Sequence, residues 1–143
     1  MKKIILAWPD DERIAEFENA LAASGAEILR CGSGAGALEA VEEYQDIMLA
    51  VIAEKLADMT GLELVGKILA VNAMIGCAVA SRLSAEDFHE ESEGLGILMR
   101  LPLHPEVQDA AELLAHLKRI GLIARKNQVD VAYQFKNWGK YMI

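Results

Sequence analysis

The sequence predicts an α/β protein in which five short strands alternate with five helices around one parallel sheet. Residues 47–53 form a continuous apolar run, which suits a strand buried on both faces. A short polar loop follows, and from Gly61 onward apolar residues recur at helical spacing. The rest of the chain repeats this alternation without a low-complexity linker. Because parallel strands need a crossover connection, the strand–loop–helix order indicates a parallel sheet covered on both faces.

The remaining elements are predicted from the same signals in chain order. Strands are expected over residues 3–8, 26–30, 47–53, 75–80 and 95–101. The helices that follow them begin after the acidic segment 10–12, after the glycine-rich loop 32–36, at Gly61, after Ser84 and at about Glu106. Gly25 and Gly94 are expected to end the first and fourth helices. Right-handed crossovers and this length favour a flavodoxin-like (βα)5 doubly wound sandwich with strand order 2-1-3-4-5.

Composition indicates a single globular domain. The chain has 143 residues, of which 53% are hydrophobic and 25% charged. No apolar run approaches the roughly 20 residues needed to cross a bilayer, and the first run is too short for a signal peptide. We therefore expect a cytoplasmic protein with no membrane partner. Cys31 and Cys77 show no metal-ligand spacing and are expected to act as small buried hydrophobes.

Charge is distributed unevenly along the chain. Residues 1–117 carry 8 basic and 21 acidic side chains, whereas residues 118–143 carry 6 basic and 1 acidic. An acidic body disfavours binding to nucleic acid. We therefore expect no nucleic-acid partner.

Two segments carry a resemblance to a known family. The segment Asp58-Met59-Thr60-Gly61-Leu62-Glu63-Leu64 is similar to the loop into the third helix of receiver (CheY-like) domains in bacterial two-component response regulators. The segment Pro9-Asp10-Asp11-Glu12-Arg13-Ile14 resembles the first loop of the same family. Supporting matches are Gly34-Ala35-Gly36-Ala37-Leu38-Glu39-Ala40, Gly94 and Pro102. The resemblance covers about residues 2–120 and implies a receiver-like domain over 1–125.

The resemblance implies phosphoryl transfer from a histidine kinase to an aspartate at the end of the third strand. An acidic pair after the first strand holds Mg²⁺ in that family, because hard cations prefer carboxylate oxygens. A Ser or Thr after the fourth strand and a Lys before the Pro of the fifth bind the phosphoryl group. The metal and the Lys neutralise the charge on its oxygens.

Most of these positions are changed in the present sequence. The phosphoacceptor position is Ala53, the first acidic position is Pro9 and the Lys position before Pro102 is Leu101. Arg100 lies one residue early, on the opposite face of its strand, and should not replace the Lys. The aromatic switch position is occupied by Leu98, and Ser81 matches the Ser/Thr position.

Three features near this site have two readings each. Asp10 and Asp11 are either residual Mg²⁺ ligands, Asp10 above all, or helix-capping residues. Glu54 is either a built-in mimic of a phosphorylated aspartate or a solvated loop charge beside Lys55. The loop Gly32-Ser33-Gly34-Ala35-Gly36 is either a phosphate-binding turn or a plain turn with Ser33 as its cap. The plain reading is favoured in each case, so we expect no cofactor and weak or absent Mg²⁺ binding.

The C-terminal extension 126–143 is unusually apolar for a chain end. Its apolar residues are interleaved with Lys126, Lys136 and Lys140. One reading is a basic-aromatic strip for nucleic acid or an anionic membrane. The favoured reading is an amphipathic segment that packs on the body or on a second subunit, because so much apolar surface is unfavourable in water.

We therefore predict a degenerate receiver, not an enzyme, that takes part in phosphorelay signalling through protein–protein contacts. Its residual pocket would comprise Asp10, Asp11, Ala53, Glu54, Ser81, Leu101 and Pro102. By the resemblance, its partner surface would be the fourth helix, fifth strand and fifth helix. The partner can also be a second copy of the chain, bound through the last helix and tail. The alternative is a flavodoxin-like module that binds a small anionic ligand or a nucleotide in the vacated pocket. A small enzyme lacks support, since no nucleophile–base pair or metal cluster is recognisable.

Overall fold

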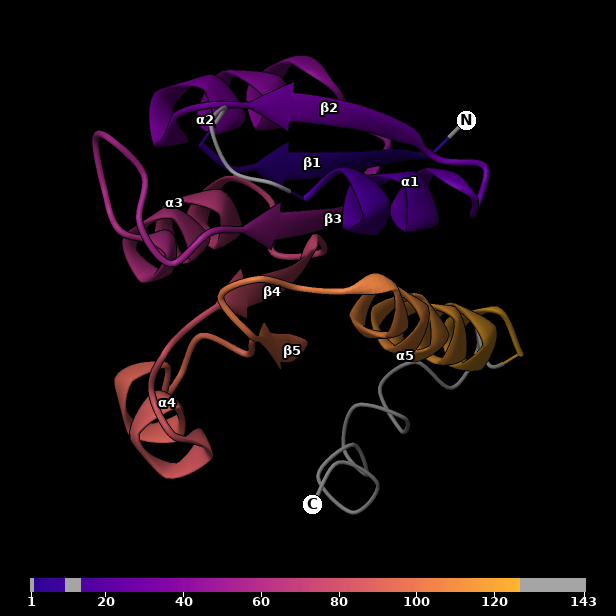
Figure 1. Ribbon diagram of the computed structural model, residues 1–143. Coiled ribbons are helices and arrows are strands. Elements are labelled where there is room, and N and C mark those ends of the chain that lie inside the picture. The colour runs from indigo at the N-terminus through magenta and orange to yellow at the C-terminus, as the bar shows by residue number, and fades with distance from the viewer. Residues whose placement is uncertain (1, 10–13, 127–143) are drawn as a thin grey trace.

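The computed structural model describes residues 2–9 and 14–126 and contains a five-stranded parallel sheet in the order β2-β1-β3-β4-β5 (Figure 1). The strands are β1 (Lys3–Ala7), β2 (Glu27–Cys31), β3 (Ile47–Ile52), β4 (Gly76–Ala80) and β5 (Met99–Leu101). The helices are α1 (Ala15–Ala22), α2 (Gly34–Glu43), α3 (Gly61–Val71), α4 (Ala85–Glu91) and α5 (Val107–Lys126). This arrangement confirms the predicted flavodoxin-like fold. The predicted extension lies, apart from Lys126, outside the described residues.

The core lies on both faces of the central strands. Residues 4–7 of β1 and 49–52 of β3 are completely buried, as the apolar run predicts for strands covered on both sides. α1 packs against α5 on one face of the sheet, and α2 packs against α3 on the other. Within residues 2–9 and 14–126, no helix combines the length and apolar character needed to cross a membrane.

Side-chain caps begin three of the helices. Ser33, Thr60 and Ser84 each accept a hydrogen bond from the backbone N–H three residues on, in α2, α3 and α4 respectively. The expected caps of α2 and α4 are thereby confirmed. The start of α1 differs, because Ile14 is the N-cap residue and makes no side-chain cap bond. Gly25 has a φ of 91° but lies in the turn beyond the cap residue Ala23.

β5 is shorter than predicted. A strand was expected over residues 95–101, but only Met99–Leu101 pairs with β4. Gly94 and Gly96 have φ angles of 86° and 64°, which break the extended backbone before the strand. Among the described residues, β4 is the one strand that pairs with β5 and holds it extended. The alternation pattern alone could not reveal this break.

A close backbone approach joins the end of β3 to the start of α3. The Gly61 N–H donates to the Glu54 carbonyl at 2.9 Å. A Cβ at Gly61 would collide with the Ala53 carbonyl oxygen and would lie 3.1 Å from Val79. Only glycine therefore allows α3 to begin this close to the sheet.

We predict that Gly61→Ala lowers the free energy of unfolding by about 1–3 kcal/mol, because backbone atoms must move to admit the methyl group. Gly66→Ala is the matched control in the same helix, since a Cβ there meets nothing within 4 Å. That control should be neutral or stabilising by up to about 1 kcal/mol. Urea denaturation of both variants measures the difference, and equal midpoints would contradict the close approach.

Candidate functional site

The candidate site lies where the strands end, at the carboxyl edge of the sheet. Ala53 directly follows β3, is 5% exposed, and donates its N–H to the Ala7 carbonyl at 2.9 Å. Trp8 directly follows β1, is 2% exposed, and donates its N–H to the Cys31 carbonyl at 3.0 Å. A small cavity of about 180 Å³ lies beside these two residues, and its other walls are Pro9, Glu54, Lys55, Arg82, Leu103 and His104.

Leu101 does not contribute a side chain to this cavity. It pairs with Ala80 in the β4–β5 ladder, is fully buried, and accepts a hydrogen bond at its carbonyl from the Ser81 N–H. Arg100 is exposed, and its guanidinium donates to the Ser81 carbonyl at 3.4 Å. Because the ladder contains no register shift here, Arg100 does not take the place of the missing Lys, as predicted.

The structure separates the other predicted pocket residues. The Ser81 hydroxyl accepts a hydrogen bond from the Leu83 N–H at 3.1 Å, and Ser81 lines a neighbouring groove between α3 and α4. Pro102 is exposed and is not among the described residues that line the cavity beside Ala53. Asp10 and Asp11 lie outside the described residues. Of the predicted residues that the structure describes, only Ala53 and Glu54 lie together around that cavity.

Glu54 links two loops at this edge. Its carboxylate accepts a hydrogen bond from the Arg82 backbone N–H at 2.7 Å and another from the Arg82 Nε at 2.9 Å. The contact therefore connects the β3–α3 loop with the β4–α4 loop. Burial alone would raise the pKa of the Glu54 carboxyl, but the Arg82 N–H, its guanidinium and Lys55 together lower that pKa. Glu54 is thus a bound carboxylate and not a freely solvated loop charge.

A second carboxylate of the β3–α3 loop occupies the start of α2. Asp58 accepts hydrogen bonds from the N–H groups of Gly34 and Ala35 at 2.9 and 3.0 Å. These two bonds are the main reason that the pKa of Asp58 is lowered. The Met59 side chain lies against Gly34, so the same loop also packs on the first turn of α2.

This contact decides between the two readings of the glycine-rich loop. A phosphate-binding turn needs free N–H groups at the helix N-terminus. Here the Asp58 carboxylate and the Ser33 hydroxyl accept hydrogen bonds from three of them, those of Gly34, Ala35 and Gly36. The loop is therefore a capped turn that the protein's own side chains satisfy.

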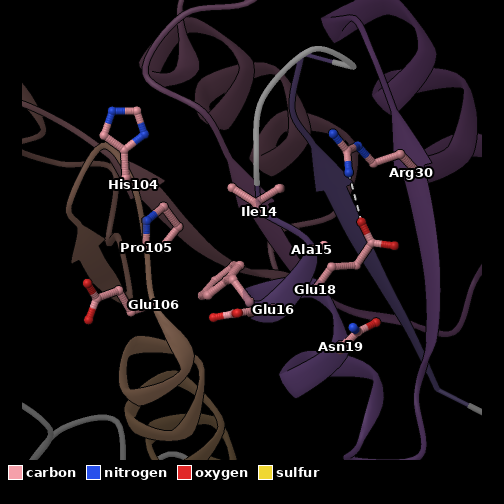
Figure 2. A pocket seen from close by; sticks show the side chains of 10 residues that line it. Ile14, Ala15, Glu16, Glu18, Asn19, Arg30, His104, Pro105 and Glu106 are labelled. Carbon is pink, nitrogen blue, oxygen red and sulfur yellow. Dashed lines mark hydrogen bonds and ion pairs between the residues drawn. The ribbon is translucent and has the colours of Figure 1, made fainter.

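A larger cavity, of about 830 Å³, lies between the start of α1 and the loop before α5 (Figure 2). Its wall includes the carboxylates Glu16, Glu18 and Glu106, and one guanidinium, that of Arg30. Arg30 is already engaged, because it donates to Glu18 at 2.7 Å and to the Pro9 carbonyl at 3.0 Å. This excess of negative charge is unfavourable for an anionic ligand.

Sequence reasoning missed several residues of the site. Trp8 directly follows β1 and Arg82 is the second residue after β4, so the rule that sites lie at the carboxyl ends of parallel strands could have indicated them. The contact between Asp58 and α2 joins residues 24 positions apart and leaves no local sequence signal. Within the described residues, no group of three His, Cys, Asp or Glu side chains is placed to hold a metal ion.

We predict that Asp58→Asn is less stable than the wild type at pH 7, because the amide carries no charge to place at the N-terminus of α2. The pKa of Asp58 is lowered in the fold, so its contribution is fully present above its unfolded pKa of about 3.9 and is lost as pH falls through the folded value. Urea denaturation at pH 7 and pH 3 should show a difference that shrinks in acid. A constant difference would contradict this role for the charge.

We also predict that Glu54→Gln lowers the free energy of unfolding by about 0.5–1.5 kcal/mol, a modest value because Arg82 is largely exposed. Hydrogen exchange should accelerate at the Arg82 amide, whose acceptor loses its charge. Glu91→Gln, an exposed carboxylate at the end of α4, is the matched control and should leave that amide unchanged. Equal exchange in both variants would argue against the link.

Comparison with known proteins identifies the fold. No family model matches the sequence, and no curated protein matches it. Solved structures do match. A response regulator receiver domain protein from Clostridium thermocellum has a TM-score of 0.72 and 16% identity, with 86% of this chain and 99% of that chain covered.

Two further structures show the same likeness. The chemotaxis response regulator CheY4 of Vibrio cholerae has a TM-score of 0.71 and 14% identity, with 82% of this chain and 98% of that chain covered. The signal receiver domain of an HD domain-containing protein from Pseudomonas fluorescens Pf-5 has a TM-score of 0.73 and 14% identity, with 88% of this chain and 93% of that chain covered. The chain therefore has the fold of response regulator receiver domains.

Proposed function

We propose that this protein is a receiver-type module of two-component signalling that has lost phosphoryl transfer and acts by binding other proteins. The observation that carries the proposal is the pairing of a buried alanine, Ala53, with a fully buried leucine, Leu101, on a receiver fold. At these two positions the family resemblance requires a carboxylate and an amine.

Each lost group has a chemical consequence. The Ala53 methyl group cannot accept a phosphoryl group. The Leu101 side chain is apolar and buried, so it cannot neutralise charge on phosphoryl oxygens as a Lys ammonium would. Pro9 supplies no side-chain oxygen for Mg²⁺. Three independent contributions to the chemistry are missing, so no single substitution would restore it.

The link between Glu54 and Arg82 supports a permanently set surface. The carboxylate holds the β4–α4 loop to the β3–α3 loop without any added group. We propose that this link gives the loop one fixed position, in the manner of the built-in mimic considered above. A module of this kind has no catalytic step, so we propose that it is not an enzyme.

The proposed partner is another signalling protein, bound through α4, β5 and α5 together with the C-terminal extension. α4 presents five charged or titratable side chains to solvent: Glu86, Asp87, His89, Glu90 and Glu91. Such a surface suits a basic partner segment, because complementary charge favours encounter and orientation. Self-association through the last helix and extension belongs to the same proposal.

A second candidate function is the binding of a small anion beside Ala53. Lys55, Arg82 and His104 line that cavity, together with the Glu54 carboxylate to which Arg82 is already bound. Its volume of about 180 Å³ is below the roughly 300 Å³ at which ordinary ligand pockets begin, which disfavours a nucleotide. A thermal-shift series with phosphate and sulfate separates this candidate from the main proposal, since bound anion raises Tm.

The main proposal predicts no phosphorylation. The protein is incubated with acetyl phosphate and Mg²⁺, or with beryllofluoride and Mg²⁺, and followed by intact mass and NMR. We expect no phosphoryl adduct and no Mg²⁺-dependent shift around Ala53, because the acceptor and Lys positions are apolar. A receiver with a complete site, run in parallel, is the positive control. An adduct on this chain would overturn the proposal.

A further inference from the structure

The outer side of β5 is an open edge of the sheet. β5 is the last strand in the order, and none of the described residues pairs with the side that faces away from β4. The Ser81 N–H donates to the Leu101 carbonyl at 3.0 Å, so the polar backbone groups of Leu101 face β4. Because these groups alternate sides along a parallel strand, the Arg100 N–H in the middle of β5 faces outward. An edge of this kind can bind an extended segment.

The chain contains a segment with the pattern of such a strand. Residues 129–136 read Val-Asp-Val-Ala-Tyr-Gln-Phe-Lys, so that four apolar residues, Val129, Val131, Tyr133 and Phe135, occupy every second position. β-branched and aromatic residues in a period of two favour a half-buried strand over a helix. Asn137 and Gly139 follow and are typical of a turn.

The position of α5 excludes pairing of this segment with its own β5 edge. α5 runs back from the carboxyl edge and ends at Lys126. Only two residues lie between Lys126 and Val129 in the sequence, so a following strand would run parallel to β5. α5 lies with α1, on the face opposite α2 and α3. A strand added outside β5 through a helix on that face would make a left-handed crossover. Such connections are almost absent from proteins.

We propose that residues 129–136 form a strand on the β5 edge of a second copy of this chain, so that two copies exchange tails reciprocally. Each copy then gives one strand and receives one, as a two-fold interface requires. The exchange avoids the left-handed crossover, because the added strand belongs to the other chain. This inference deepens the proposed binding function, on which it rests for the role of the dimer in signalling.

Charge supports β5 as the receiving edge. α4, with its exposed carboxylates, lies at the β5 side of the sheet and far from β2 (Figure 1). Lys136 ends the strand-like segment, and Lys126 and Lys140 lie on either side of it in the sequence.

Analytical ultracentrifugation of the full chain over a range of concentrations tests the tail. We expect a dimer for the wild type and a dissociation constant at least about tenfold higher for Val131→Asp with Phe135→Asp. The matched control, Ala132→Asp with Gln134→Asp, adds the same charge to the opposite face of the segment and should stay dimeric. A monomeric wild type, or equal weakening by both double variants, would overturn the inference.

Proline substitutions in the full chain test the edge. Arg100→Pro removes the outward N–H from β5, whereas Ile28→Pro removes the equivalent N–H from β2, since the Glu27 N–H points inward to the Lys2 carbonyl. Circular dichroism confirms that each variant folds. We expect dissociation with Arg100→Pro alone. A dimer that persists in Arg100→Pro, or dissociates with Ile28→Pro instead, would refute the assigned edge.

Hydrogen exchange distinguishes exchange between copies from pairing within one chain. The Arg100 amide, on the outer side of β5, should be protected only at concentrations where the dimer forms. Protection in a monomer would overturn the inference. The phosphorylation assay tests the proposed function separately. A monomeric chain would overturn the tail exchange and leave the proposed loss of phosphorylation standing. A phosphoryl adduct would overturn the proposed function and leave the dimer standing.

Discussion

The approach of α3 to the end of β3 is the constraint on which the site depends. Gly61 lies so close to the Ala53 carbonyl that no side chain fits, and its N–H closes the loop onto the Glu54 carbonyl. The eight-residue path from Ala53 to Thr60 is thereby held in one shape. Its Lys55–Thr60 bridge and the bond from the Leu56 N–H to the Met59 carbonyl stabilise the same turn. Residues far apart in the chain are positioned by this loop.

Both carboxylates of the loop bind neighbouring loops of the protein itself. Glu54 accepts hydrogen bonds from Arg82, and Asp58 accepts them from the first N–H groups of α2. Groups that could otherwise hold an anion or a cation are therefore already satisfied. A small ligand would have to compete with these intramolecular partners, which are present at high effective concentration. The contacts therefore agree with the proposed module, which keeps a receiver shape as a binding surface.

Features that depend on residues close in the sequence could be predicted, whereas features that depend on contacts between distant segments could not. The run 47–53 and the caps Ser33 and Ser84 were visible in the sequence, because burial patterns and caps depend on near neighbours. The short β5 was not, since its length reflects two glycines at positive φ and a single pairing partner. At the site, Ala53 and Glu54 were identified by position, whereas Trp8 and Arg82 emerged only when separate strand ends met.

The sequence by itself determined the strand and helix order, the buried central strands and the absence of a carboxylate and an amine at positions 53 and 101. These are properties of composition and periodicity, which the chain carries locally. Only the tertiary structure decided that Glu54 is bound to Arg82, that Asp58 fills the start of α2, and that the β5 edge lies open among the described residues. Such contacts depend on distances between segments that the fold brings together, and no local pattern records them.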